Sequence, residues 1–80
     1  MVIIKPLSTN VNIASAASDV SSAKLVSIIN TETTVVTVTV SNGNEVNVAA
    51  GERILLEKET SETISSTGSN VFASKVAYKN

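Results

Sequence analysis

The segment 34–40 is the feature that most constrains the fold of this chain. From residue 36 it alternates valine and threonine, which puts Val36, Val38 and Val40 on one face and the threonines on the other. A period of two residues is that of a half-buried strand, and β-branched side chains suit strands. The segment also has no charge and no proline, so it would be prone to aggregation if exposed. We therefore predict a strand whose three valines are buried in the core or covered by a neighbouring subunit.

The connection that follows this strand, residues 41–44, allows its pairing register to be predicted. A two-residue Asn-Gly turn would place Val38 opposite Asn47. A three-residue loop ending at Gly43 places Val38 opposite Val46 and gives the glycine the left-handed bulge position. Because a slip of one residue moves every side chain to the other face, we predict the second register.

The rest of the chain repeats short apolar runs at roughly 8–12 residue spacing, separated by turn residues, which is typical of a β-sandwich or barrel. We predict an all-β, compact β-sandwich, Greek-key or jelly-roll-like, with about seven short strands. The segment 24–30 carries apolar residues on both faces, so we expect it to lie centrally in a sheet. The other strands are predicted at residues 2–5, 45–49, 52–58, 62–65 and 71–78.

The N-terminal part, residues 1–23, is expected to be a short strand, stopped by Pro6, followed by an extended arm. Its segment 8–23 is rich in serine, alanine and asparagine and has little periodicity. A short strand at 11–14 and a helical turn around 14–22 are the alternatives, and the polar residues there favour turns over helix. Residues 24–80 are expected to form the sandwich core, so the chain is predicted to be a single domain overall.

The absence of cysteine and histidine removes the usual means of stabilising a domain of 80 residues. No disulfide or thiolate metal site can form, and the commonest metal ligand is missing. Self-association or docking onto a partner is the remaining route, so we expect a homo-oligomer or an assembly component.

Charge and hydropathy limit the partners. The formal net charge is −1 and the basic residues are scattered, so we expect no nucleic-acid partner. No apolar stretch approaches about 18 residues, and the N-terminal run is too short for a signal peptide, so we expect no membrane partner and synthesis in the cytoplasm.

The sequence offers little for catalysis. Ser21 and Lys24 have a Ser-x-x-Lys spacing, but lead into a predicted strand rather than a helix. Glu57 and Glu59 could be a carboxylate pair, but charges at a strand end more often protect a sheet edge. Asp19 has no calcium-loop pattern around it. We predict that the protein is not an enzyme and has no catalytic, cofactor-binding or metal-binding residues.

Phe72 and Tyr78 are the only aromatic residues. Alternation in the strand 71–78 places them on the same face as Val76. Such residues are typical both of cores and of binding hot spots, and the sequence does not separate the two. The candidate interface or core anchors are therefore Phe72, Tyr78, Val36, Val38 and Val40.

Residues 30–78 resemble small β-sandwich structural proteins of the virions of tailed bacteriophages, which decorate capsids or serve as tail accessories. The resemblance rests on Asn30-Thr31, the Val-Thr alternation of residues 37–40, Ala50-Gly51-Glu52, Leu56-Glu57-Lys58, Glu62-Thr63-Ile64 and Lys75-Val76-Ala77-Tyr78. It implies a decoration or cement protein that is located in the virion and stabilises the particle surface. The implied partners are further copies of the chain, with a trimer favoured, and another virion protein such as the major capsid protein. A tail, neck or fibre-associated adaptor is the alternative.

Overall fold

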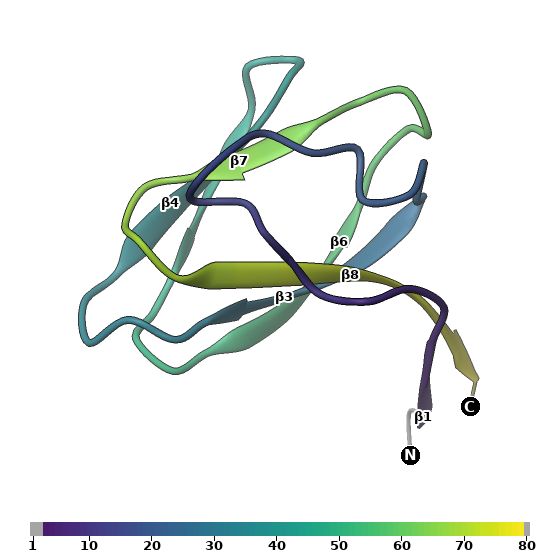
Figure 1. Ribbon diagram of the computed structural model, residues 1–80, viewed down its shortest axis with the longest axis horizontal. Helices are drawn as coiled ribbons and strands as arrows, with labels where there is room; N and C mark the ends of the chain where they lie inside the picture. Colours follow the sequence, from purple (N-terminus) through teal and green to yellow (C-terminus); the bar gives the residue numbers. More distant parts are fainter. Residues whose placement is uncertain (1–2, 80) are drawn as a thin grey trace.

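The computed structural model describes the backbone of residues 3–79 and the side chains of residues 4–77. The described chain is all-β and folds into two antiparallel sheets (Figure 1), which confirms the predicted fold class. The strands are β1 (Ile3–Pro6), β2 (Val11–Asn12), β3 (Leu25–Asn30), β4 (Val36–Val40), β5 (Glu45–Val48), β6 (Arg53–Glu57), β7 (Ile64–Ser66) and β8 (Val71–Lys79).

The larger sheet has five strands in the order β1-β8-β3-β6, with β2 also paired to β8. β1 and β2 lie along the same edge of β8, because Pro6 pairs with Val76 and Val11 pairs with Ala73. The residues between them bulge away from the ladder. β3 lies between β8 and β6, so the prediction that segment 24–30 is central in a sheet is confirmed.

The smaller sheet has three strands in the order β5-β4-β7. Its β4–β5 hairpin has the predicted register, with Val38 opposite Val46 and Val36 opposite Val48. Gly43 has a φ of 96° at the end of the loop, where a side chain would be strained. Elsewhere from β3 to β8 the chain crosses from one sheet to the other at each connection, so the two sheets are built from interleaved parts of the sequence.

The core lies between the sheets and is made almost entirely of β-branched side chains. Val26 and Ile28 project into it from β3, and Val38 and Val48 from the smaller sheet, each with an exposed fraction of 0%. Val71 and Ala73 of β8 are equally buried. The inward face of β8 is therefore the face of Val71, which leaves Phe72 on the opposite face.

Residues 13–23 belong to this core, a role that the expectation of an extended arm or long loop did not include. Ile13, Val20 and Ala23 are exposed by 1% or less. The segment also links the sheets: the Ile13 N–H donates to the Val71 carbonyl, and the Ile13 carbonyl accepts from the Ser66 N–H. Figure 1 shows the chain after β1 crossing in front of β8 and continuing to β7. Sequence reasoning missed this role because the three buried residues are too widely spaced to give a periodic pattern.

A left-handed turn ends this segment. Val20, Ser21 and Ser22 have φ values of 52°, 59° and 55°, and the Ala23 N–H donates to the Asp19 carbonyl at 3.2 Å. This conformation costs a non-glycine residue about 1–2 kcal/mol. Burial of Val20, the first residue of the turn, and of Ala23, which follows it, offsets the strain. The described residues contain no right-handed helix, so the alternative of a helical turn at 14–22 is wrong in handedness.

Candidate docking surface

The larger sheet has a second apolar face, on the side away from the core. The pairing register puts one set of side chains on this side of the sheet, which we call the outer face: Ile4 from β1; Phe72, Ser74 and Val76 from β8; Leu25, Ser27 and Ile29 from β3; and Arg53, Leu55 and Glu57 from β6. Antiparallel sheets usually have one apolar and one solvated face. A sheet with two apolar faces is expected to be covered by something else.

The exposure of individual side chains shows where cover is missing. Ile4 is 38% exposed and Leu55 is 42% exposed, although both are large apolar residues. Phe72 and Ile29 lie opposite each other in the register and are half-buried. Ser27 and Ser74, a second opposed pair, are buried by their larger neighbours. The outer face is thus an apolar surface with small polar residues at its centre, which is the composition of a protein contact rather than of a hydrated sheet.

Arg53 is held against this surface by a hydrogen bond within the chain. Its Nη1 donates to Ser27 Oγ at 2.5 Å, and its backbone is opposite Ile29. The bond directs the guanidinium toward the middle of the outer face, although the residue as a whole is exposed. Glu57 occupies the other end of β6 on the same face, so the outer face has one charge of each sign along its β6 border.

The predicted anchors lie in different parts of the structure. Val36, Val38 and Val40 are 2%, 0% and 7% exposed and belong to the core. Phe72 is on the outer face and is half-buried. The Tyr78 backbone pairs with Ile4, whereas its side chain lies outside the described residues.

Sequence reasoning missed Ile4, Ile29 and Leu55 as surface residues. The alternation of strand 24–30 did indicate two apolar faces. Only the pairing of β3 with both β6 and β8 shows that its outward residues are part of a continuous surface.

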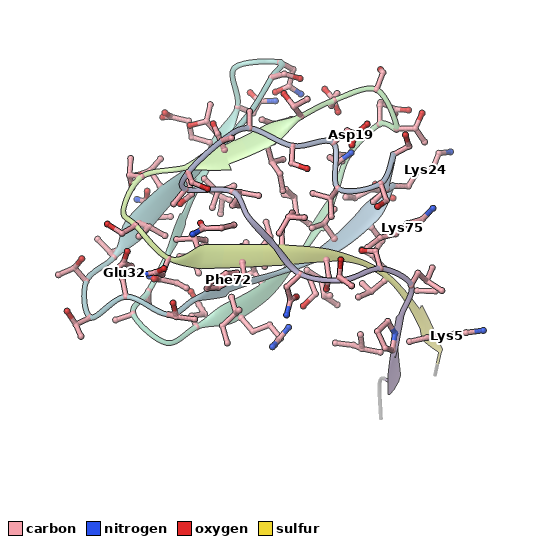
Figure 2. The ribbon with its side chains drawn as sticks, in the orientation of Figure 1. Lys5, Asp19, Lys24, Glu32, Phe72 and Lys75 are labelled. Carbon is pink, nitrogen blue, oxygen red and sulfur yellow. The ribbon has the colours of Figure 1, made fainter. Side chains whose placement is uncertain are left out.

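A shallow hollow of about 490 Å³ lies where the larger sheet extends past the smaller one. Its lining combines polar and cationic side chains with apolar ones: Ser22, Lys24, Leu25, Thr60, Lys75, Val76 and Ala77. Figure 2 shows the side chains of Lys24 and Lys75 extending from the same side of the molecule, with Lys5 below them. The hollow could accept an acidic segment, because its rim is cationic and its floor apolar.

Lys58 lies close to this region but serves the fold. Its Nζ donates to the Ala23 carbonyl at 2.7 Å and to the Glu59 carbonyl at 3.1 Å, and the residue is only 5% exposed. Burial lowers the pKa of this ammonium, while the charges of Asp19 and Glu62 oppose the shift. The hydrogen bonds hold the end of the left-handed turn against the chain just after β6, so this lysine contributes to packing rather than to ligand binding.

The residues considered for catalysis lie in or just after the left-handed turn and around the end of β6. Ser21 is in the left-handed turn, and Lys24 extends outward beside the hollow. Glu57 and Glu59 are both exposed, at the end of β6 and just beyond it. Within residues 3–79 no group of three or more acidic side chains could hold a metal ion together. Over the same residues no helix is long and apolar enough to cross a membrane.

Comparison with known proteins gives no relative: no family model, no curated protein and no solved structure matches the chain. The function therefore has to be argued from the molecule's own surfaces.

Proposed function

We propose that this protein is a structural component of a virion, a decoration or cement protein that attaches to the particle through the outer face of its larger sheet. The observation that carries the proposal is the exposure of Ile4 and Leu55 on the same face as the half-buried Phe72 and Ile29. Burying apolar area contributes roughly 25 cal/mol per Å², so a flat apolar face of this kind gains stability once a partner covers it.

The size of the molecule supports the same proposal. The Cα radius of gyration is 11.5 Å, and the smaller sheet, with half-buried threonines and an exposed asparagine on its solvent side, leaves one side suited to solvent. A small, two-sided module with one apolar and one polar outside face fits a subunit that lies on the surface of a larger assembly. The resemblance to phage structural proteins points to a particle as that assembly.

The alternative, an adaptor in a tail, neck or fibre, is favoured by a different observation. The hollow between Lys24 and Lys75 would hold an acidic segment of a neighbouring protein. The two proposals differ in the surface that is covered and in the number of copies carried by each particle.

The test is to tag the chain in the genome that encodes it and to sediment particles from the lysate through a density gradient. Quantitative mass spectrometry then gives the ratio of this chain to the shell protein. Many copies in a fixed ratio to the shell support decoration, and a single ring's worth supports the adaptor. Absence of the chain from every particle fraction overturns both proposals.

Surface variants separate the two contacts. The double variant Ile29→Thr/Phe72→Thr keeps β-forming residues in place while reducing the apolar outer face, and it should lose particle binding. Val35→Thr is the matched control, because Val35 is 62% exposed but lies in the loop before β4. Lys24→Glu/Lys75→Glu should abolish binding only if the hollow is the contact. If Ile29→Thr/Phe72→Thr still binds the particle and Lys24→Glu/Lys75→Glu does not, the adaptor is favoured.

A further inference from the structure

The strand β6 is a free edge of the larger sheet. β6 pairs only with β3, and no other described strand lies on its far side. The Asn30 N–H donates to the Glu52 carbonyl, and the Lys58 N–H donates to the Lys24 carbonyl. In an antiparallel ladder the residues that bond to one neighbour alternate with those that point away. The even residues of β6 therefore bond to β3, and the N–H and C=O groups of Arg53, Leu55 and Glu57 point outward, where another strand could pair with them.

The sequence of this edge is complementary to itself when reversed. Residues 52–58 read Glu-Arg-Ile-Leu-Leu-Glu-Lys. Two copies paired antiparallel about Leu55 place Arg53 opposite Glu57 and Leu55 opposite Leu55. These are the residues whose backbone groups point outward, so one register satisfies the hydrogen bonds and opposes unlike charges.

Side chains on both faces of the sheet suit the same register. On the outer face, Leu55 is 42% exposed and would be covered by its own copy across the two-fold axis. On the core side, Ile54 and Leu56 are only partly buried against the core, and each would lie opposite the other in the second copy. Glu52 would lie opposite Lys58, which introduces no like-charge pair. All seven positions of the edge are thus compatible with a two-fold partner.

The other edges of the two sheets are less suited to pairing. β1 carries Pro6, which has no N–H to donate. β7 is bridged by Ser18, whose N–H and C=O both bond to Ile64. β5 carries Glu45 and Asn47, both polar and exposed, on the side of the smaller sheet that is away from the core. Native proteins commonly protect edges by proline, charge or cover, and β6 alone combines apolar centre residues with terminal charges of opposite sign.

We propose that the chain forms a two-fold homodimer by antiparallel pairing of β6 with β6 of a second copy, which joins the larger sheets into one continuous sheet. This inference does not rest on the proposed particle, since it concerns an edge and not the outer face. It gives the expected oligomer a two-fold symmetry in place of the trimer that the resemblance favours. The outer faces of both copies remain on one side of the joined sheet and stay available to a larger partner.

The test is the mass of the isolated chain in solution, by sedimentation equilibrium across micromolar concentrations. The wild type should have twice the 8.3 kDa mass of one chain. Arg53→Glu places like charges opposite one another at both ends of the paired strands, as does Glu57→Arg. Because cross-strand charge pairs change stability by up to about 1 kcal/mol each, either variant should raise the dissociation constant by about tenfold or more.

Mixing the two single variants gives the decisive measurement. A chain with Arg53→Glu and a chain with Glu57→Arg are complementary to each other in this register, so the mixture should form a heterodimer about as tightly as the wild type dimerises, whereas each variant alone dimerises more weakly. The double variant Arg53→Glu/Glu57→Arg should also dimerise with itself. Rescue by these combinations is not expected of a residue that only stabilises the monomer.

Two controls separate loss of dimerisation from loss of folding. Arg53→Glu removes the bond to Ser27, so its circular dichroism spectrum must match the wild type; Glu57→Arg changes an exposed side chain and leaves that bond in place. Leu55→Pro removes one outward N–H without breaking a bond to β3, and should prevent dimerisation. A wild-type chain that stays monomeric, or folded single variants that dimerise as tightly as the wild type, would overturn the proposal.

Discussion

The Glu32 carboxylate accepts a hydrogen bond from the backbone N–H of Asn70 at 2.8 Å, across 38 residues of sequence. The same oxygen, Oε1, also accepts from the Ser69 N–H. Figure 2 shows Glu32 beside the start of β8. This side chain therefore ties the turn before β8 to the loop that follows β3. Because both donors stabilise the charged form, these bonds lower the pKa of Glu32.

The first prediction is a loss of stability at acid pH that depends on Glu32. A carboxylate with a lowered pKa stabilises the fold above its ordinary pKa, and this contribution is lost as the pH falls through the folded-state value. Glu32→Gln removes the charge, so the variant should be less stable at neutral pH and should lose less on acidification. Urea unfolding between pH 2 and 7 measures both effects. Glu45→Gln, at an exposed position on β5, should follow the wild-type curve. If Glu32→Gln also followed it, the stabilising role of Glu32 would be contradicted.

The second prediction compares two glycines with similar backbone angles. Gly68 has a φ of 91° and Gly43 a φ of 96°. A Cβ at Gly68 would lie 3.0 Å from Glu32 Oε1 and 3.2 Å from Val36 Cγ1, whereas one at Gly43 meets nothing within 4 Å. Gly43→Ala should therefore cost only the conformational strain, about 1–2 kcal/mol. Gly68→Ala should cost more, because Val36 is buried and the Glu32 bonds must shift. Equal losses in thermal or chemical unfolding would argue against the close contact.

The third prediction concerns Asn30, which is completely buried at the end of β3. Its Nδ2 donates to the carbonyls of Thr34, Val48 and Ala49, and its Oδ1 accepts from the Glu32 N–H at 2.8 Å. Asn30→Ala removes the Asn30 side-chain bonds to the buried Val48 carbonyl and to three less buried backbone groups, and it should cost about 2–3 kcal/mol of unfolding free energy.

Asn30→Asp is the matched control for that variant. It keeps the acceptor for Glu32 but puts a carboxylate oxygen against the carbonyls, so it should be the more damaging of the two at neutral pH and should recover in part as the carboxyl is protonated. If Asn30→Ala were as stable as the wild type, water would have to replace the hydrogen bonds that the Asn30 side chain makes.

The fourth prediction is that relieving backbone strain stabilises the protein. Ser21 is exposed and has a φ of 59°. Glycine adopts this conformation without a Cβ clash, so Ser21→Gly should raise the unfolding free energy, by up to about 1 kcal/mol after the greater chain entropy of glycine is subtracted. Ala17→Gly is the control, because Ala17 is equally exposed and has no positive φ. It should be neutral or destabilising. A loss of stability with Ser21→Gly would mean that the left-handed turn is not formed in solution.

The sequence was most informative where neighbouring residues alternate. The valines at residues 36 and 38 and the position of Gly43 determined a strand, a loop length and a register, and all of these are present in the structure. The pairing of a hairpin depends on local chain geometry, so it can be derived from adjacent residues. The same alternation in β8 placed Phe72 and Val76 on one face correctly, but not which face looks inward.

What only the tertiary structure decided is how the segments far apart in sequence come together. Ile13, Val20 and Ala23 are scattered among polar residues, and their burial depends on the two sheets that the segment links. The outer face of the larger sheet and the free edge of β6 likewise exist only once β3 has paired with β6 on one side and β8 on the other. The amino-acid sequence alone determined that this chain is all-β and how the β4–β5 hairpin pairs, because strand periodicity is local. The surfaces that carry the proposed function needed the fold, because they depend on long-range pairing that no local pattern encodes.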